Sequence, residues 1–423
     1  MNRLFLTTIG VLCFATLNAQ TTKEEMLANP SLMNSNGLVY QTNFKPQTPA
    51  PKGYKPFYIS HYGRHGSRYH YTGFDYMTLR NTMVSADEAN ALTPTGKDLK
   101  DRICKLYDDG YNRAGDLTRT GFMQHQGIAE RMVNSFPEIF ADGAKIDVKS
   151  STSHRVIMSM DAFLQKLNAL RPNLNIYTES SKRLMSYINN EKKDSLNVYL
   201  RGAEWNKVNS EFGQQIIQPE RFVNTIFADT AYAKSKVNGF QLMRKLYEIN
   251  STMQGIDDLD FDFSDFFTQE ELFNNWQLQN VYWYSNYSTC PYTKSHGAKL
   301  AKALLTNFLD EADKAIAGNG TSVTLRFGHD TGLLPLASLM GLEGCNAEVT
   351  DLAELYKVWC DYKIIPMAGN LQMIFYKSDK SNDILVKVLL NENEVKLPIE
   401  SKTAPYYNWS EVEAYYRDII AKM

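Results

Sequence analysis

Arginine and histidine side chains stand together in three short stretches of this sequence. Residues 64–68 read Arg-His-Gly-Ser-Arg, Arg155 follows a run of Ser and Thr, and His329 is followed directly by Asp330. Each stretch comes between a short strand-like segment and a segment whose apolar spacing favours a helix. If the three strands are neighbours, these side chains meet at the carboxyl edge of the sheet, where ligands bind in open α/β sheets.

This combination of residue types indicates chemistry on a phosphate ester. Arginine keeps its charge and offers parallel donors to phosphate oxygens. An imidazole can attack phosphorus as a nucleophile, and a nearby carboxylic acid can protonate the leaving alcohol. We therefore expect a phosphomonoester hydrolase that works through a phosphohistidine, with Gly66 allowing the backbone to approach the phosphate closely.

Metal-dependent chemistry is not favoured by the same stretches. The sequence has no lysine-containing phosphate loop and no carboxylate cluster that would hold a divalent cation. His61 and His65 lie four residues apart, a spacing that suits a metal site on a helix, but Gly63 and Gly66 oppose a helix there. We expect no metal and no cofactor.

Apolar periodicity and capping residues predict the elements that carry these stretches. Strands are expected at 57–60, 146–148 and 323–327, with a hairpin formed by 373–376 and 384–390. Helices are expected over 93–107, from Thr118 onward, after Ser153, over 295–317 and over 333–340. Strands that alternate with helices indicate an α/β fold with a central, mostly parallel sheet flanked by helices.

The chain changes character between residues 169 and 290, where it is rich in Asn, Glu, Lys, Phe and Tyr and mostly helical in period. We expect an inserted, mainly helical cap domain at 169–290 and an α/β core formed by 20–168 and 291–423. Within the insert, Lys182-Arg183 and Lys192-Lys193 are basic pairs. They could line a funnel for a phosphorylated ring, although a solvated helix face is the simpler interpretation.

Four motifs in order resemble the histidine acid phosphatases, the larger branch of the histidine phosphatase superfamily. Residues 64–69 resemble the family signature Arg-His-Gly-x-Arg, and residues 115–124 resemble its second landmark. Arg155 before 160–163 resembles the third phosphate arginine, and residues 329–330 resemble the C-terminal His-Asp pair. The motifs span most of the chain, and the resemblance implies the family's fold and reaction type.

Within that family, residues 64–69 and 389–398 resemble the multiple inositol polyphosphate phosphatases. This sequence departs from their pattern twice: His70 replaces a usual Pro, and residues 329–331, His-Asp-Thr, replace the usual His-Ala-Glu, as in phytases and general acid phosphatases. The resemblance implies inositol polyphosphates, such as phytate, as favoured substrates. The departures leave the attacked ester position open, with a broad-specificity acid phosphatase or a sugar-phosphate phosphatase as the alternative.

The resemblance also implies a role for each residue of the site. His65 would be the nucleophile, and Asp330 would be the general acid. The phosphoryl oxygens would be held by Arg64, Arg68, Arg155 and His329. His65 must be neutral and Asp330 protonated, although their ordinary pKa values of about 6.5 and about 3.9 have the reverse order, so an acidic pH optimum is expected.

Composition limits the partners and the location of the protein. The chain has 423 residues, 43% of them hydrophobic, and 45 Lys+Arg against 47 Asp+Glu give a net charge of −2, which excludes a basic nucleic-acid-binding domain. Residues 1–19 combine one Arg, an apolar run and a terminal Leu-Asn-Ala, which predicts a cleaved signal peptide. We expect an exported protein, periplasmic or secreted, without a membrane span in the mature chain, whose partner is a small phosphomonoester. The sequence leaves the oligomeric state open.

The sequence alone leaves the reaction class and the state of the cysteines open. A phosphate-ester binding protein without turnover is a different class, and a transferase such as a phosphoglycerate mutase shares the Arg-His-Gly chemistry. The cysteines after the predicted signal peptide are Cys104, Cys290, Cys345 and Cys360. They could form disulfides, with Cys345 and Cys360 nearest in sequence, or remain free buried thiols.

Overall fold

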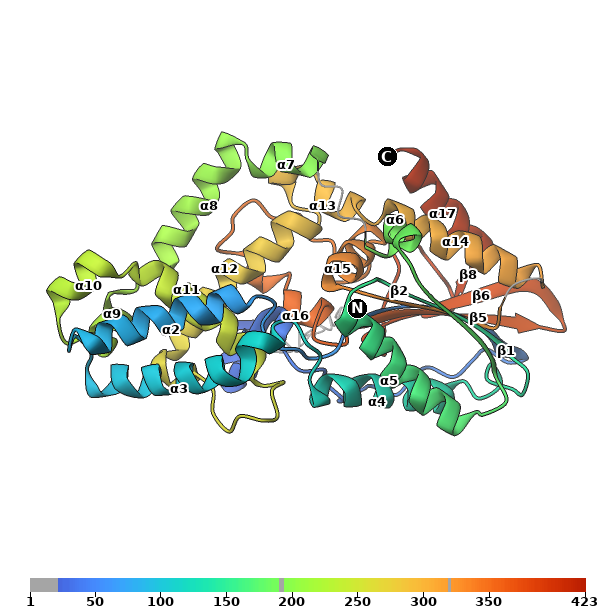
Figure 1. Ribbon diagram of the computed structural model, residues 1–423. Coiled ribbons are helices and arrows are strands. Elements are labelled where there is room, and N and C mark those ends of the chain that lie inside the picture. The colour runs from blue at the N-terminus through green and yellow to red at the C-terminus, as the bar shows by residue number, and fades with distance from the viewer. Residues whose placement is uncertain (1–21, 190–193, 319–320) are drawn as a thin grey trace, which may run out of the picture.

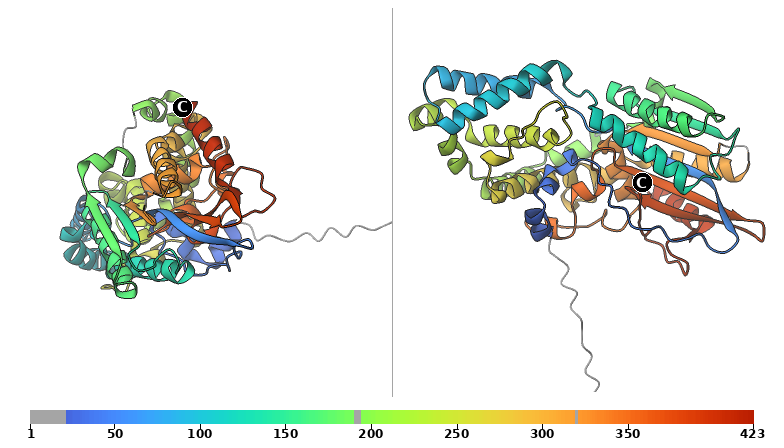
Figure 2. Two further views of the ribbon diagram at one scale, coloured as in Figure 1. Left: turned by 90° about the vertical axis from the view of Figure 1, so that its right-hand side faces the viewer. Right: turned by 90° about the horizontal axis from the view of Figure 1, so that it is seen from below.

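The computed structural model describes residues 22–189, 194–318 and 321–423. These residues form two parts that lie side by side: a sheet covered by helices, and a helical part (Figure 1). The right-hand view of Figure 2 shows the same division, with the N-terminal stretch in dark blue near the junction of the two parts. The predicted signal peptide and Lys192-Lys193 lie outside the described residues.

The strands are β1 (Tyr54–Arg64), β2 (Lys145–Ser150), β3 (Asn175–Ser180), β4 (Val323–Gly328), β5 (Asn370–Ser378), β6 (Ser381–Leu390), β7 (Asn393–Glu394) and β8 (Tyr407–Asn408). The helices are α1 (Thr22–Ala28), α2 (Gly73–Glu88), α3 (Pro94–Gly110), α4 (Arg119–Ser135), α5 (His154–Leu170), α6 (Met185–Ile188), α7 (Asp194–Leu200), α8 (Ala203–Ile216), α9 (Glu220–Ile226), α10 (Thr230–Lys236), α11 (Gly239–Met253), α12 (Gln269–Tyr287), α13 (His296–Lys299), α14 (Lys302–Ile316), α15 (Asp330–Leu339), α16 (Asp361–Ile364) and α17 (Trp409–Ala421). A 3₁₀ helix, η1 (Pro30–Gly37), follows α1.

The sheet has the strand order β3-β2-β4-β1-β5-β6-β7, and β8 also pairs with β6. The pairs β2–β3, β2–β4 and β1–β4 are parallel, whereas β5, β6, β7 and β8 join in antiparallel pairs. Helices α4 and α5 cover one face, and α14 and α17 cover the other (Figure 1). The predicted α/β class with a helix-flanked central sheet is confirmed, but the sheet is mixed and not mostly parallel, and its parallel half carries the motifs.

Most predicted elements are found near their expected positions. Thr118 caps α4 as predicted, and Thr93 caps α3 in the same way: each side chain accepts a hydrogen bond from a backbone N–H group of the first turn. The predicted hairpin is β5–β6. The predicted helix over 295–317 is instead two helices, α13 and α14, because the amides of Leu300 and Ala301 donate to carbonyls three residues back, those of Gly297 and Ala298.

The observed parts do not follow the predicted boundaries of the insert. Strand β3 lies within 169–290, yet it pairs with β2 in the central sheet. Helices α2 and α3 come from the predicted core segment, yet Leu79 and Leu99 share an apolar cluster with Phe222 and Leu246 of α9 and α11. An amphipathic helix needs a partner for its apolar face, and these helices find it across the sequence boundary.

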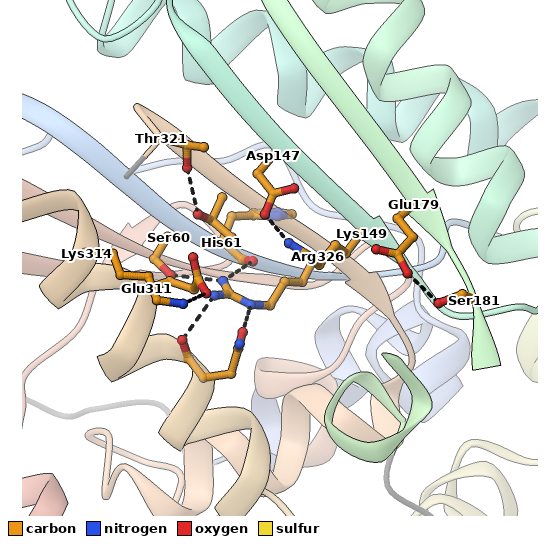
Figure 3. Close-up of polar contacts among 12 residues, drawn as sticks. Ser60, His61, Asp147, Lys149, Glu179, Ser181, Glu311, Lys314, Thr321 and Arg326 are labelled. Atoms are coloured by element: carbon orange, nitrogen blue, oxygen red, sulfur yellow. Dashed lines mark hydrogen bonds and ion pairs between the residues drawn. The ribbon is translucent and has the colours of Figure 1, made fainter. Parts of the chain in front are cut away.

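The centre of the sheet contains a buried charge, Arg326 of β4. Its guanidinium donates to Asn307 Oδ1 at 2.7 Å and to Ser60 Oγ at 3.0 Å. Figure 3 shows the guanidinium among polar side chains of β1, β2, β4 and α14. Arg326 lies over the ring of Phe308, 4.3 Å from its centroid, so the aromatic ring and the neutral side chains of Asn307 and Ser60 contact this charge directly.

Cys104, Cys290, Cys345 and Cys360 are free thiols, and the last three are buried. Among the described residues, no helix combines the length and the apolar character needed to cross a bilayer.

Candidate active site

Three parallel strands bring the predicted site residues together. Arg64 at the end of β1 is in register with Gly328 of β4, and Ser150 of β2 is in register with Phe327. The chain segments that follow these strands therefore meet at one edge of the sheet, beside the helical part. A cavity of about 370 Å³ lies there, and its lining includes His65, Arg68, Arg155 and Asp330.

The backbone after β1 is clamped by the second sequence motif. Thr118 N and Oγ1 both donate to Ser67 O, at 2.9 and 3.1 Å. Gln124 accepts from Ser67 N through Oε1, at 2.9 Å, and donates to Ser67 Oγ through Nε2. A Cβ at Gly66 would lie 2.3 Å from the carbonyl oxygen of Gly121. The glycine is thus required for packing against α4, a reason that differs from the predicted approach of phosphate.

His65 is held as a neutral imidazole with one nitrogen free. Its Nδ1 lies 2.9 Å from the carbonyl oxygen of Gly66, so Nδ1 carries the proton and donates, and Nε2 keeps its lone pair. Burial, and then the charges of Arg64 and Arg155, hold the pKa of His65 well below its usual value. The surroundings of His65 therefore favour the neutral imidazole over the charged one.

The arginines around His65 have nitrogens without hydrogen-bond partners. Arg64 is buried and anchored through Nη1, which donates to Ile365 O at 2.7 Å and to Asn36 O. Within the described part of the chain, Arg64 Nε, Arg68 Nε and Arg155 Nε make no hydrogen bond, whereas Arg64 Nη2 is paired with the Asp330 carboxylate at 2.9 Å. Native proteins rarely leave buried donors unsatisfied, so three such guanidinium groups around one imidazole indicate a site for an anion.

His329 lies behind the cavity and contacts Arg155. Arg155 Nη2 lies 3.5 Å from His329 Nδ1, and Ser151 Oγ lies 3.0 Å from His329 Nε2. A guanidinium can only donate, so Nδ1 accepts and the proton sits on Nε2, directed at Ser151. Burial and Arg155 lower the pKa of His329 to about 4. In this geometry His329 positions the guanidinium of Arg155. A direct contact between His329 and a phosphoryl oxygen stays a prediction.

Asp330 is the carboxylate of the site. Its Oδ2 lies 2.9 Å from Arg64 Nη2 and accepts from Asn36 Nδ2 at 2.9 Å, while Oδ1 accepts from Thr331 N at 2.9 Å. Burial raises the pKa of Asp330, but Arg64, Arg68 and the other donors outweigh burial, so the net pKa is lowered. The expected reversal needs a lowered pKa for His65 and a raised pKa for Asp330. With these partners the pKa of His65 is lowered as expected, but that of Asp330 is lowered as well.

Asn36 was not identified from the sequence. It belongs to η1, where neither apolar period nor a motif singles it out, and it lines the cavity. Its amide donates to Asp330, and its carbonyl accepts from Arg64. No local signal could have revealed it, because the contact joins residues separated by 294 positions.

Among the remaining histidines, His70 lines the cavity, where its Nε2 pairs with Asp75 at 3.0 Å. His61 lies in the core against Phe163 and Phe327, and burial lowers its pKa to about 3. No group of three or more metal-ligating side chains occurs in the described ranges. Lys182 and Arg183 are not among the residues that line the cavity.

Comparisons with known proteins agree with this geometry. Residues 63–391 match the family model described as histidine phosphatase superfamily (branch 2). Multiple inositol polyphosphate phosphatase 1 of Gallus gallus is 22% identical over 346 residues, covering 74% of this chain and 71% of that protein. The human protein of the same name is 23% identical over 343 residues, covering 72% of this chain and 66% of that protein.

Solved structures show the same fold. The Bifidobacterium longum multiple inositol polyphosphate phosphatase in complex with inositol hexasulfate superposes with a TM-score of 0.74 at 19% identity, covering 91% of this chain and 97% of that chain. The phytase from D. castellii superposes with a TM-score of 0.68 at 14% identity, covering 92% and 85% of the two chains.

Proposed function

Because this chain belongs to the histidine phosphatase superfamily (branch 2) and is a phosphomonoester hydrolase, we propose that it releases phosphate from inositol polyphosphates through a covalent phosphohistidine. One observation carries the mechanism: a neutral His65 with a free Nε2 stands among three arginines that have unsatisfied nitrogens. The inositol polyphosphate substrate is supported by the names of the relatives, which share this fold.

In the first step, the lone pair of His65 Nε2 forms a bond to phosphorus as the bond between phosphorus and the ester oxygen breaks. The Gly66 carbonyl accepts a hydrogen bond from Nδ1–H, which stabilises the ring as it becomes positive. Asp330 gives its proton to the departing alkoxide, so a neutral alcohol leaves. Arg68 and Arg155 donate to the phosphoryl oxygens, where they stabilise the transition state.

In the second step, water attacks phosphorus on the phosphohistidine. Its proton passes to the carboxylate of Asp330, the bond between nitrogen and phosphorus breaks, and the electron pair returns to His65 Nε2. Inorganic phosphate leaves, and both residues are restored to their starting states. The two steps need no metal and no cofactor.

Binding of the substrate raises the pKa of Asp330 and so favours its protonated form. A phosphoryl group bound to Arg64 competes with Asp330 for the same guanidinium and places negative charge beside the carboxyl. Both effects raise the pKa of Asp330. The second pKa of a phosphate monoester is about 6. Below this pH the substrate binds as a monoanion, whose proton can pass to Asp330. We therefore expect activity to fall as pH rises above this value.

Release of inorganic phosphate from p-nitrophenyl phosphate and from phytate tests the proposal. We expect both substrates to be hydrolysed with an acidic optimum, and the phytate products to appear as a series of lower inositol phosphates over time. A protein that binds phytate without releasing phosphate would support the alternative of a non-catalytic binding protein. A rate that keeps rising above neutral pH would exclude Asp330 as a protonated donor.

We also propose that the protein is exported, in a periplasm or outside the cell, from the pattern of residues 1–19. N-terminal sequencing of the protein made by its native host tests this, because export predicts a mature chain that begins at Gln20. A mature chain that begins at Met1 would contradict export.

A further inference from the structure

The wall of the cavity opposite the sheet differs in charge from the side that carries His65. It is formed by side chains of α11 and α12, which we call the helical wall: Tyr247, Glu248, Ser251, Thr252, Gln279, Tyr282 and Trp283. No lysine or arginine belongs to this set, and Glu248 is its one charged member. Among the described side chains that line the cavity, the arginines therefore lie at the end that carries His65, and the one charged group of the helical wall is a carboxylate.

A buried arginine outside the cavity lining holds the polar groups of the helical wall in place. Arg244 is 8% exposed and donates to Asn275 O at 2.6 Å and to Gln279 Oε1 at 3.0 Å. Its Nη2 lies 3.4 Å from Glu248 Oε1. Because Gln279 accepts through its oxygen, its amide NH₂ is left as a donor. Arg244 thus orients one donor and one acceptor without itself lining the cavity.

The other side chains of the helical wall offer neutral donors and aromatic faces. The indole N–H of Trp283 is buried and has no hydrogen-bond partner in the part of the chain that the structure describes. The ring of Tyr282 is 47% exposed, and Tyr71, on the adjoining wall, is 60% exposed. Ser251 and Thr252 donate their hydroxyls to carbonyls of their own helix, so they add no free donor.

These groups suit a polyol ring better than a second phosphate. A carboxylate accepts strongly from a hydroxyl, an amide or indole N–H donates to a hydroxyl oxygen, and aromatic faces pack against the C–H groups of a ring. A phosphate dianion placed against Glu248 would instead meet a like charge in a partly desolvated cavity.

We propose that the helical wall is a subsite for the hydroxyl-bearing side of the substrate, in which Glu248 accepts a hydrogen bond from a free hydroxyl. The proposal rests on the proposed function and narrows it: the favoured substrates are rings with a free hydroxyl across from the reacting phosphate. Lower inositol phosphates and sugar phosphates belong to this class, whereas a fully phosphorylated ring does not.

The test is the ratio of kcat/KM for phytate to kcat/KM for an inositol monophosphate, measured in the wild type and in Glu248→Gln. The substitution keeps the shape and removes the charge, so we expect the ratio to rise by ~10-fold, which corresponds to about 1.4 kcal/mol of removed discrimination. Glu248→Lys should raise it further. Glu220→Gln is the matched control, because Glu220 is an exposed glutamate of α9 outside the cavity lining, and it should leave the ratio unchanged.

A ratio that stays at the wild-type value in both Glu248 variants would overturn the proposal. So would a ratio that falls, because Glu248 would then favour the phosphorylated ring. Hydrolysis of p-nitrophenyl phosphate by the wild type separates this failure from failure of the proposed function. If the wild type cleaves p-nitrophenyl phosphate but the Glu248 substitutions have no effect, the proposed function stands and the subsite is refuted. If the wild type is inactive, the proposed function itself is refuted.

Discussion

Two groups of arginine in this protein differ in how many of their side-chain nitrogens the rest of the chain satisfies. Arg326, in the middle of β4, directs its nitrogens at Asn307, Ser60 and the carbonyl of His61. Arg64 and Arg155, at the carboxyl edge of the same sheet, keep nitrogens that no described group satisfies. Arg64 is as buried as Arg326, whereas Arg155 is partly exposed, and it is Arg64 and Arg155 that lower the pKa of His65.

The difference shows that burial of a charge does not identify a functional site. Desolvation lowers the pKa of Arg326 and of Arg64 alike, so burial alone does not separate them. What separates them is the number of donors that the fold itself satisfies. A structural arginine has its donors matched by the chain, whereas a ligand-binding arginine leaves donors for an anion that the chain does not contain.

The largest effect is expected for His65→Ala. Turnover of p-nitrophenyl phosphate should fall on the order of 10⁴-fold or more, because no other side chain can form the covalent intermediate. Binding of inorganic phosphate should persist, because the arginines remain, and isothermal calorimetry measures it. Full activity in this variant would refute the nucleophile, and loss of phosphate binding would show that the arginines do not act as a preformed anion site.

A slightly smaller effect is expected for Asp330→Asn. The rate should fall about 10²- to 10³-fold with an alkyl ester such as inositol phosphate, because a poor leaving group needs the proton. The loss should be smaller with p-nitrophenyl phosphate, whose leaving group is stable as an anion. Equal losses in kcat for the two substrates would count against the acid role.

A matched pair of substitutions tests the comparison of the arginines directly. Arg155→Met should lower kcat/KM by about 10²-fold, because one donor to the phosphoryl group is lost. It should not lower the free energy of unfolding, because Arg155 stands among like charges.

Arg326→Met should have the opposite profile. We expect kcat/KM per folded molecule to be unchanged and the free energy of unfolding to fall by about 2 kcal/mol, because Ser60 and Asn307 lose their buried donor. Urea denaturation and steady-state kinetics on both variants measure the two quantities. If both variants lose activity and keep stability, the distinction between the two groups fails.

The smallest effect is expected at Asn36. Its hydrogen bond lowers the pKa of Asp330, so Asn36→Ala should raise that pKa. Because the acid acts while protonated, the falling limb of kcat should move to higher pH by less than about one unit. Asn36→Asp should move it further, since a like charge also raises the pKa. If the role of Asn36 is purely structural, the substitutions will change kcat but not the pH at which kcat falls.

Local signals were sufficient for much of the fold and for the central members of the site. Thr118 was identified as a helix cap because a cap depends on neighbours within one turn. His65 and Asp330 were identified because each follows a strand that alternation or a turn marks. The boundaries of the helical part were wrong, since nothing near β3 in the sequence reports that it pairs with β2.

The sequence by itself determined the residue types of the candidate site, an imidazole, three guanidinium groups and a carboxyl, and the strands that end beside them. Only the tertiary structure decided how these groups are partnered: Asn36 on Asp330, His329 behind Arg155, and Glu248 across the cavity. The physical reason is the distance along the chain over which each kind of interaction acts. Caps, turns and periodicity act over a few residues, whereas the protonation and charge of a buried group depend on every side chain that the fold packs around it.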